Sequence, residues 1–389
     1  MEKIGIVSLY YQNGNYGGQL QSYALPRALQ SLGFYGEQIR FVRDLDGSMS
    51  RKSRMRSKNP AVRVKAVGAT VKHALKEAST VVSNYPVREQ LRKRENAFRS
   101  FERSVPHSDV VYDEHSIAAA GASYDAFVCG SDVIWNAGVD PQISALGFAP
   151  SNKLKVAFAP SLGVGSIPAG WFDKYQQYLD RLDAISVREA SVAKDLHTLM
   201  PNREVFCAAD PTLLLSRNEW EQSCRPQQHD GYALCYLLGD SRAQRDRAAE
   251  TARQAGLDLL TFPHVSGNSF RSCDRGFGDI QNYDADAFDF ISLIRDAELI
   301  ITDSFHAVVF SSIFHKKFIA LDRMNGSTSK MGGRVRNYLA SLGLEAQLAT
   351  LSDESWASFT DEIDYSSVDD RMGEIRDRSL TYLRNSLNR

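Results

Sequence analysis

This sequence of 389 residues has no long apolar runs and no excess of charge of either sign. No run reaches the roughly 18 apolar residues that a membrane span requires. The start, Met1–Tyr11, leads directly into a strand pattern with no room for a signal peptide, so we expect a cytoplasmic protein. With 46 basic and 47 acidic residues the net charge is -1, which gives no general case for nucleic-acid binding.

Cysteine is scarce as well: the five residues are odd in number and scattered along the chain. Neither a disulfide framework nor a zinc site follows from them. No group of His and carboxylate residues has the spacing of metal ligands, so we expect neither a metal nor a cofactor. The composition, 43% hydrophobic and 24% charged, is ordinary for a globular protein, and the length favours two domains.

The most informative stretch of the sequence is Ala297–Leu321. It contains a short apolar strand, Leu299–Thr302, two residues of helix N-cap type, Asp303 and Ser304, and then an apolar helix. His306 is therefore expected in the first turn of a helix, just past the carboxyl end of a buried strand. That edge of an α/β sheet favours anions, and an imidazole there could move a proton. A histidine that only caps or packs is the alternative.

A glycine-containing loop follows the first predicted strand, Ile4–Leu9. The loop Asn13–Gly18 precedes a helix over Leu20–Leu32, and its glycines allow a ligand to approach the backbone and the helix amides. The loop does not match the G-x-G-x-x-G pattern of dinucleotide sites. An ordinary turn is the alternative.

Strands and helices alternate through the rest of the first half, which predicts a parallel, right-handed α/β sheet. Polar residues follow each strand, at the edge where a ligand crevice forms. The strands are Tyr124–Cys129, Lys155–Ala159, Asp183–Val187 and Val205–Ala208, and the residues after them are Ser131, Asp132, Ser161, Arg188 and Asp210.

Two such series are present, separated by a polar segment. We expect a first α/β domain over residues 1–215, a linker over 216–230, a second α/β domain over 231–365, and a C-terminal helix over 366–389 that packs back on the body. This predicts an α/β protein with two Rossmann-like parallel-sheet domains in a GT-B-like architecture, with the active cleft between them.

The first domain carries a basic helical insertion over about residues 46–105. Its segment Arg51–Lys76 has nine Lys or Arg residues and no Asp or Glu. Such a segment is a candidate for peripheral contact with the anionic inner face of a membrane. A solvated surface insertion is the alternative.

Five segments, in order, resemble the polysaccharide pyruvyl transferase family over nearly the whole chain. They read NYGGQLQSYAL, YDAFVCGSDVIWN, SVRE, ADPTLLL and ITDSFHAVVFSSIFHKKF. The resemblance implies a bacterial transferase of exopolysaccharide or cell-surface glycan synthesis. It would move pyruvate from phosphoenolpyruvate to two hydroxyls of a sugar as a cyclic ketal, with release of phosphate. It also implies a GT-B-like fold, His306 as the catalytic histidine and Arg188 as a donor-binding arginine.

The chemistry suggests further roles. The donor has a phosphate and a carboxylate, which require cations and hydrogen-bond donors. A general acid, His306, must protonate the methylene carbon, and Asp132 could accept the hydroxyl proton or simply cap its loop. The remaining predicted donor-binding residues are Ser131, Ser161, Ser304, Phe305 and Arg334, with turn-forming roles as the alternative for the serines. The predicted acceptor-binding residues are Asn15, Tyr16, Gly17, Gly18 and Trp135.

The sequence departs from the family at two positions. Some members have arginine where this chain has Ser304, which leaves Arg334 or Arg336 as the second anion-binding cation. Val133 replaces a common glutamine. Two rival functions stay open, a nucleotide-sugar glycosyltransferase of the same fold and a non-catalytic saccharide-binding protein. We expect the saccharide acceptor to be lipid-linked, with a free saccharide as the alternative.

Overall fold

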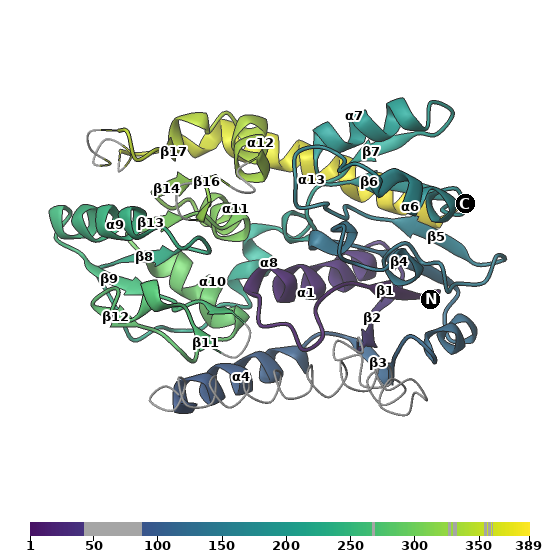
Figure 1. Ribbon diagram of the computed structural model, residues 1–389, viewed down its shortest axis with the longest axis horizontal. Helices are drawn as coiled ribbons and strands as arrows, with labels where there is room; N and C mark the ends of the chain where they lie inside the picture. The colour runs from purple at the N-terminus through teal and green to yellow at the C-terminus, as the bar shows by residue number, and fades with distance from the viewer. Residues whose placement is uncertain are drawn as a thin grey trace, which may run out of the picture.

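The computed structural model describes residues 1–42, 88–266, 269–325, 328–329, 333–353, 356, 359 and 361–389. The first half of the chain forms a parallel sheet of seven strands in the order β3-β2-β1-β4-β5-β6-β7 (Figure 1). The strands are β1 (Lys3–Val7), β2 (Tyr35–Phe41), β3 (His107–Tyr112), β4 (Ala126–Cys129), β5 (Leu154–Ala157), β6 (Ala184–Val187) and β7 (Val205–Cys207). The helices and short helical turns of this half are α1 (Tyr16–Ser31), α4 (Arg88–Glu102), η2 (Ile117–Ala122), η3 (Asp132–Trp135), α5 (Pro141–Ser144), α6 (Trp171–Leu179), α7 (Ala190–Leu199) and η4 (Pro211–Leu213).

The second half forms a parallel sheet of six strands in the order β12-β9-β8-β13-β14-β17. Its strands are β8 (Tyr232–Tyr236), β9 (Asp258–Thr261), β12 (Ile280–Gln281), β13 (Leu299–Thr302), β14 (Phe318–Leu321) and β17 (Leu348–Ala349). Two small antiparallel pairs, β10 (Val265–Ser266) with β11 (Ser269–Phe270) and β15 (Met324–Asn325) with β16 (Thr328–Ser329), follow β9 and β14. The helices are α8 (Arg217–Glu221), α9 (Arg242–Gln254), α10 (Ala287–Asp296), α11 (Phe305–Ile313), α12 (Gly333–Leu342) and α13 (Tyr365–Leu387), with short turns at η5 (Ser272–Asp274) and η6 (Glu345–Gln347).

The last helix joins the two sheets. α13 packs on α12 of the second half, and its later residues reach the first half, where Ser379 Oγ accepts a hydrogen bond from Ala209 N and Arg376 Nε donates one to Leu213 O. In Figure 1 this yellow helix runs from one sheet to the other. The two parallel α/β sheets with a returning C-terminal helix confirm the predicted GT-B-like fold class.

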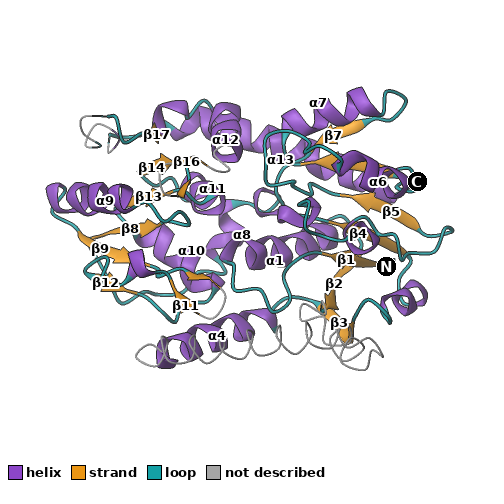
Figure 2. Ribbon diagram, viewed as in Figure 1, coloured by secondary structure: helices purple, strands orange, loops and turns teal. Residues whose placement is uncertain are grey.

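Helix α1 lies between the sheets and forms the centre of a hydrophobic core that both halves share (Figure 2). Tyr16 stacks on Phe290 of α10, with ring centroids 4.4 Å apart, and Tyr23 packs against Trp220 and Phe288. Burial of several large aromatic rings favours association of the two halves. The start of α1 is thereby fixed close to the second sheet.

Several element bounds differ from the sequence-based ones. α1 begins at Tyr16 rather than Leu20, because Asn15 caps it, and α4, at the end of the predicted basic insertion, buries Phe98 and Phe101. The basic segment Arg51–Lys76 lies outside the described residues, so its membrane contact stays a prediction. Within the described residues, no helix combines the length and apolar character that crossing a bilayer requires.

Candidate active site

The local structure around His306 follows from the strand and cap signals in its sequence. The apolar strand β13 is buried, and Ser304 adopts an extended N-cap conformation, with its Oγ accepting a hydrogen bond from Ala307 N at 3.5 Å. His306 lies in the first turn of α11 and is 6% exposed. The amides of such a turn have no intrahelical partner, so the helix start remains a suitable place for an anion.

The imidazole of His306 contacts two residues of the other half of the chain. Gly17, in the first turn of α1, has no side chain, and an added Cβ would lie 1.9 Å from His306 Nδ1. On the opposite side of the ring, Nε2 lies 3.5 Å from Asp210 Oδ2. His306 therefore lies between the first turn of α1 and the loop after β7, both in the first domain.

Asp210 is a buried carboxylate just after β7 that joins the histidine to an arginine. Its Oδ1 accepts hydrogen bonds from the amide and hydroxyl of Thr212, and its Oδ2 lies 2.6 Å from Arg188 Nη1. Burial opposes ionisation of this carboxyl, but His306 and Arg188 together hold its pKa well below the usual range. The Asp210 carboxylate therefore lies between the Arg188 guanidinium and the His306 imidazole.

Arg188 follows β6 and faces both carboxylates of the first domain. Its side chain is 5% exposed, lies 3.8 Å from Asp132 Oδ1 through Nη2, and stacks over the Phe305 ring at 4.6 Å from the centroid. Its Nε and Nη2 have no hydrogen-bond partner among the described residues. Buried guanidinium nitrogens are normally hydrogen-bonded, so these two are available to a ligand.

A cavity of about 240 Å³ lies beside Arg188 and Asp210. It is bordered by the strand ends of the first domain and by α11, α12 and α13. Arg334 contributes a second guanidinium, and burial followed by the charge of Arg188 lowers its pKa to about 10. Arg334 Nε is buried without a partner among the described residues, whereas Arg336 pairs with Asp322. Of the two candidate cations in the sequence, the structure places Arg334 at the site.

Asp132 lies on the side of Arg188 that faces α1. It has a positive φ of 53° and lies two residues after the loop glycine Gly130, and a Cβ at Gly18 would lie 3.6 Å from its Oδ2. A non-glycine residue with positive φ is strained and is often found at functional sites. Gly18 and Asp132 are therefore brought together, and Gly18 is the residue next to Gly17, which contacts His306.

The two loop serines are occupied within the protein. Ser131 Oγ donates to Ala159 O at 2.6 Å, and Ser161 Oγ donates to the Glu189 carboxylate while accepting from Gly163 N. Both side chains are fully buried. Their contacts fit loop-forming roles, and we leave them out of the proposed ligand site.

Three of the predicted acceptor contacts have structural roles. Asn15 Oδ1 accepts from the amides of Gly17 and Gly18, so the helix amides that were expected to be free are capped. Tyr16 is fully buried in the aromatic cluster between the domains. Trp135 is fully buried, donates its indole N–H to Ser144 O, and packs on Trp171, because the loop after β4 turns it into the core. We therefore exclude Tyr16 and Trp135 from the acceptor site.

Asp210 and the cavity residue Arg378 were not among the predicted site residues. Asp210 had a visible signal, since it lies two residues after the predicted strand Val205–Ala208 and precedes a proline. Arg378 had none, because it lies on α13, far along the chain, and reaches the cavity only through the return of that helix. No group of three His, Cys, Asp or Glu residues that could hold a metal is found in the described part of the chain.

Replacing Asp210 by Asn should lower the free energy of unfolding by about 3 kcal/mol, because the buried Arg188 then loses its closest counter-charge. The folded-state pKa of Asp210 is depressed, so its contribution is present above the unfolded value of about 4 and is lost as pH falls through the folded value. The stability difference should therefore shrink below about pH 4. Urea unfolding of both proteins at several pH values tests this, with the exposed Asp180→Asn as control. Equal stability of Asp210→Asn and the parent at pH 7 would contradict it.

Solved structures with similar overall shape include the UDP-GlcNAc 2-epimerases of Neisseria meningitidis and Methanocaldococcus jannaschii. The first has 8% identity, a TM-score of 0.47, and coverage of 98% of this chain and 100% of that one. The second has 12% identity, a TM-score of 0.46, and coverage of 98% and 99%. The ADP-heptose lps heptosyltransferase II of E. coli has 12% identity, a TM-score of 0.38, and coverage of 97% and 99%. These similarities are low, and nothing about the chemistry of this chain follows from them.

No match to the chain was found among curated proteins. The sequence model of a family described as polysaccharide pyruvyl transferase, in contrast, matches residues 15–325. That range begins at the cap of α1 and includes both carboxylates, Arg188 and His306, which come from both sheets. The chain therefore belongs to the polysaccharide pyruvyl transferase family.

Proposed function

We propose that this protein transfers pyruvate from phosphoenolpyruvate to two hydroxyls of a saccharide as a cyclic ketal, with release of phosphate. The observation that carries the proposal is the interdomain contact of His306 with Asp210, which itself binds Arg188 beside a cavity. A proton donor and unpaired buried cations are thus adjacent. This is the combination that an anionic enol ether requires.

We assign the cavity beside Arg188 as the binding site of the donor, phosphoenolpyruvate. Arg188 and Arg334 each have buried guanidinium nitrogens without a partner among the described residues, and both line the cavity with Phe305. A carboxylate and a phosphate would supply the missing acceptors, and the cation–π contact of Phe305 would keep Arg188 in place. Phosphoenolpyruvate acts here as co-substrate, and no further cofactor is needed.

His306 is the general acid in this proposal. Nδ1 faces the backbone of Gly17, so Nε2 is the nitrogen that can hold a proton toward Asp210, and Asp210 lines the cavity. Transfer of that proton to the methylene carbon makes the neighbouring carbon cationic, and the first sugar hydroxyl attacks it. Asp132, on the α1 side of Arg188, is placed to accept the proton of an attacking hydroxyl.

To complete the ketal, the second sugar hydroxyl must displace the phosphate. After the first hydroxyl has added, the C–O bond to phosphate breaks, and the second hydroxyl attacks the same carbon to close the ketal. One hydroxyl proton restores His306 through the carboxylates, and the other leaves with the phosphate. The protein thus returns to its starting protonation state without any redox partner.

A thermal-shift measurement tests the donor. Phosphoenolpyruvate should raise the melting temperature according to RT ln(1 + [L]/Kd), whereas UDP, GDP and their sugars should leave it nearly unchanged. Arg334→Gln should reduce the shift, since one unpaired cation of the cavity is lost, and Arg336→Gln, outside the cavity, should not. A strong shift with a nucleotide sugar and none with phosphoenolpyruvate would instead support the glycosyltransferase.

A further inference from the structure

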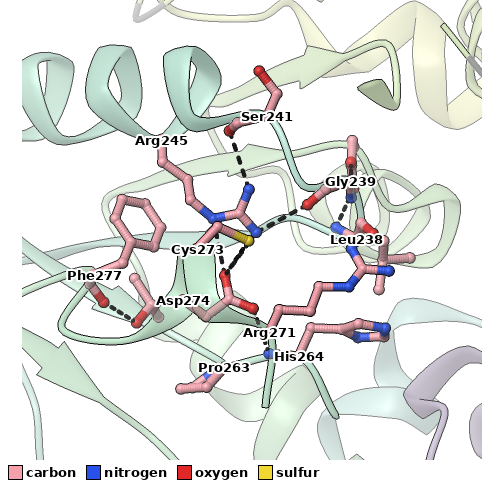
Figure 3. Close-up of polar contacts among 12 residues, drawn as sticks. Leu238, Gly239, Ser241, Arg245, Pro263, His264, Arg271, Cys273, Asp274 and Phe277 are labelled. Atoms are coloured by element: carbon pink, nitrogen blue, oxygen red, sulfur yellow. Dashed lines mark hydrogen bonds and ion pairs between the residues drawn. The ribbon is translucent and has the colours of Figure 1, made fainter. Parts of the chain in front are cut away.

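A second group of cationic residues lies at the carboxyl edge of the second sheet, away from the donor cavity. It surrounds His264, in the loop after β9, and includes Arg271, whose side chain lies next to His264 (Figure 3). In this sheet β8 is a central strand: β9 lies next to it on one side, and β13, followed by β14, lies on the other side. Open α/β sheets bind ligands at the carboxyl ends of strands where the order reverses in this way.

Four arginines act on the imidazole of His264. Burial first, and then the positive charges of Arg271, Arg94, Arg323 and Arg245, lower its pKa to about 3. Arg94 comes from α4 of the first domain, and the other three come from loops and helices of the second. The positive field is therefore the product of residues from both domains that converge on one point.

Two carboxylates lie beside arginines of this group. Asp274 is bound by the buried Arg245, with 2.9 and 2.6 Å contacts from Nε and Nη2 to Oδ1, and its Oδ2 accepts from His264 N (Figure 3). Asp303 uses both oxygens for the amides of Leu238 and Gly239, and Arg323 lies 4.0 Å from its Oδ2. Among the described residues, these two carboxylates therefore lie beside Arg245 and Arg323 and not beside Arg94 or Arg271.

The remaining arginine contacts are to uncharged groups. Arg271 donates to Leu238 O, and Arg94 donates to Pro263 O at 3.2 Å while stacking on the rings of Tyr16 and Phe98. Carbonyl oxygens and aromatic rings hold a guanidinium in place without cancelling its charge. Cations that uncharged groups hold in place in a partly buried site, as here Arg94 and Arg271, favour a multiply charged anion.

We infer that the cluster of His264, Arg94, Arg271 and Arg323 binds a phosphate or diphosphate ester carried by the saccharide acceptor. The assignment of this anion to the saccharide acceptor rests on the proposed function, whereas the presence of an anion site does not. None of these residues lines the donor cavity. Arg323 nevertheless contacts Asp303, three residues before His306, and its charge also acts on Arg334. A sugar phosphate bound by the cluster would therefore extend its sugar toward the His306 site.

Isothermal titration with inorganic pyrophosphate tests the site in the full-length protein. Arg271→Gln should weaken binding at least about tenfold, the factor expected when one charge-assisted hydrogen bond is lost. Arg275→Gln makes the same charge change at an exposed position of the same loop and should bind like the parent. Arg271→Lys should retain most of the affinity, which separates loss of charge from a local folding defect.

A variant of the donor cavity provides the reciprocal test. Arg334→Gln should leave pyrophosphate binding within about twofold of the parent, and Arg271→Gln should leave phosphoenolpyruvate binding unchanged. Loss of pyrophosphate binding in Arg334→Gln but not in Arg271→Gln, or no binding to the parent, would overturn the inference. Failure of phosphoenolpyruvate to bind, with Arg271-dependent pyrophosphate binding intact, would instead count against the proposed function alone.

The source of the diphosphate is distinguished by two further ligands under the same conditions. Geranyl diphosphate represents a lipid carrier and UDP represents a nucleotide carrier. Tighter Arg271-dependent binding of geranyl diphosphate than of pyrophosphate supports the site and identifies a lipid carrier, whereas UDP, which should hardly shift the melting temperature, should bind no more tightly than pyrophosphate. Binding of either that does not depend on Arg271 would contradict the location of the site.

Discussion

His306→Ala is expected to lower turnover by about 10² to 10⁴, the usual contribution of a positioned general acid. The side chain is held between Gly17 and Asp210 at the domain boundary and is not part of the hydrophobic core, so the variant should remain folded. His306 does not line the donor cavity, so donor affinity should change little while kcat falls. Phosphate release from phosphoenolpyruvate, measured with a saccharide that the parent protein uses, gives both quantities.

His197→Ala is the matched control, because His197 is exposed on α7 and lies outside the site. It should have the activity of the parent. A His306→Ala protein that melts at the parent temperature and turns over normally would remove His306 from the chemistry. A fall in donor affinity with unchanged kcat would reassign it to binding.

Gly17→Ala is the second variant with a large expected effect, although it adds only one methyl group. Gly17 lies within a helix and has no positive φ, so alanine by itself suits the backbone and even favours the helix by about 1 kcal/mol. The new Cβ would, however, lie 1.9 Å from His306 Nδ1, so the imidazole must move. Displacing a catalytic group by about 1 Å can cost about 10²-fold in rate, and we expect a loss of that size.

Gly14→Ala is the control for Gly17→Ala, because a Cβ at Gly14 meets no atom within 4 Å. Rates of the two variants under the conditions used for His306→Ala separate the contact from a general effect of the loop. A crystal structure of Gly17→Ala should show the His306 ring rotated away from Asp210. Parent-like activity of this variant would mean that the interdomain contact is not needed for catalysis.

The sequence predicted well what depends on neighbouring residues. The strand Leu299–Thr302, the helix that follows it and the cap at Ser304 are local features, because burial of an apolar run and satisfaction of the first helix amides are decided within a few residues. The family segments likewise predicted the parallel-sheet fold class. Strands β2 and β3 were not recognised, since β2 buries Glu37 and Gln38 and its pattern lacks an apolar run.

Polar residues at strand ends were also visible in the sequence, because carboxyl ends of parallel strands meet at one edge. That rule predicted that Arg188, Asp132 and Asp210 lie at a single edge of the sheet. It gave no ranking among them, so Asp210 was not selected although it contacts both Arg188 and His306. Which strand-end residue faces which depends on strand order and loop path.

Only the tertiary structure decided which faces of the two domains meet. Gly17 and His306 are separated by most of the chain, and nothing in either segment indicates that one makes room for the other. The same association buries Tyr16 against Phe290. The sequence had suggested Tyr16 for ligand contact. Sequence patterns report whether a side chain is buried or exposed, because burial repeats with the period of the element. They do not report the partner, because the packing of one domain on another depends on the shapes of both surfaces.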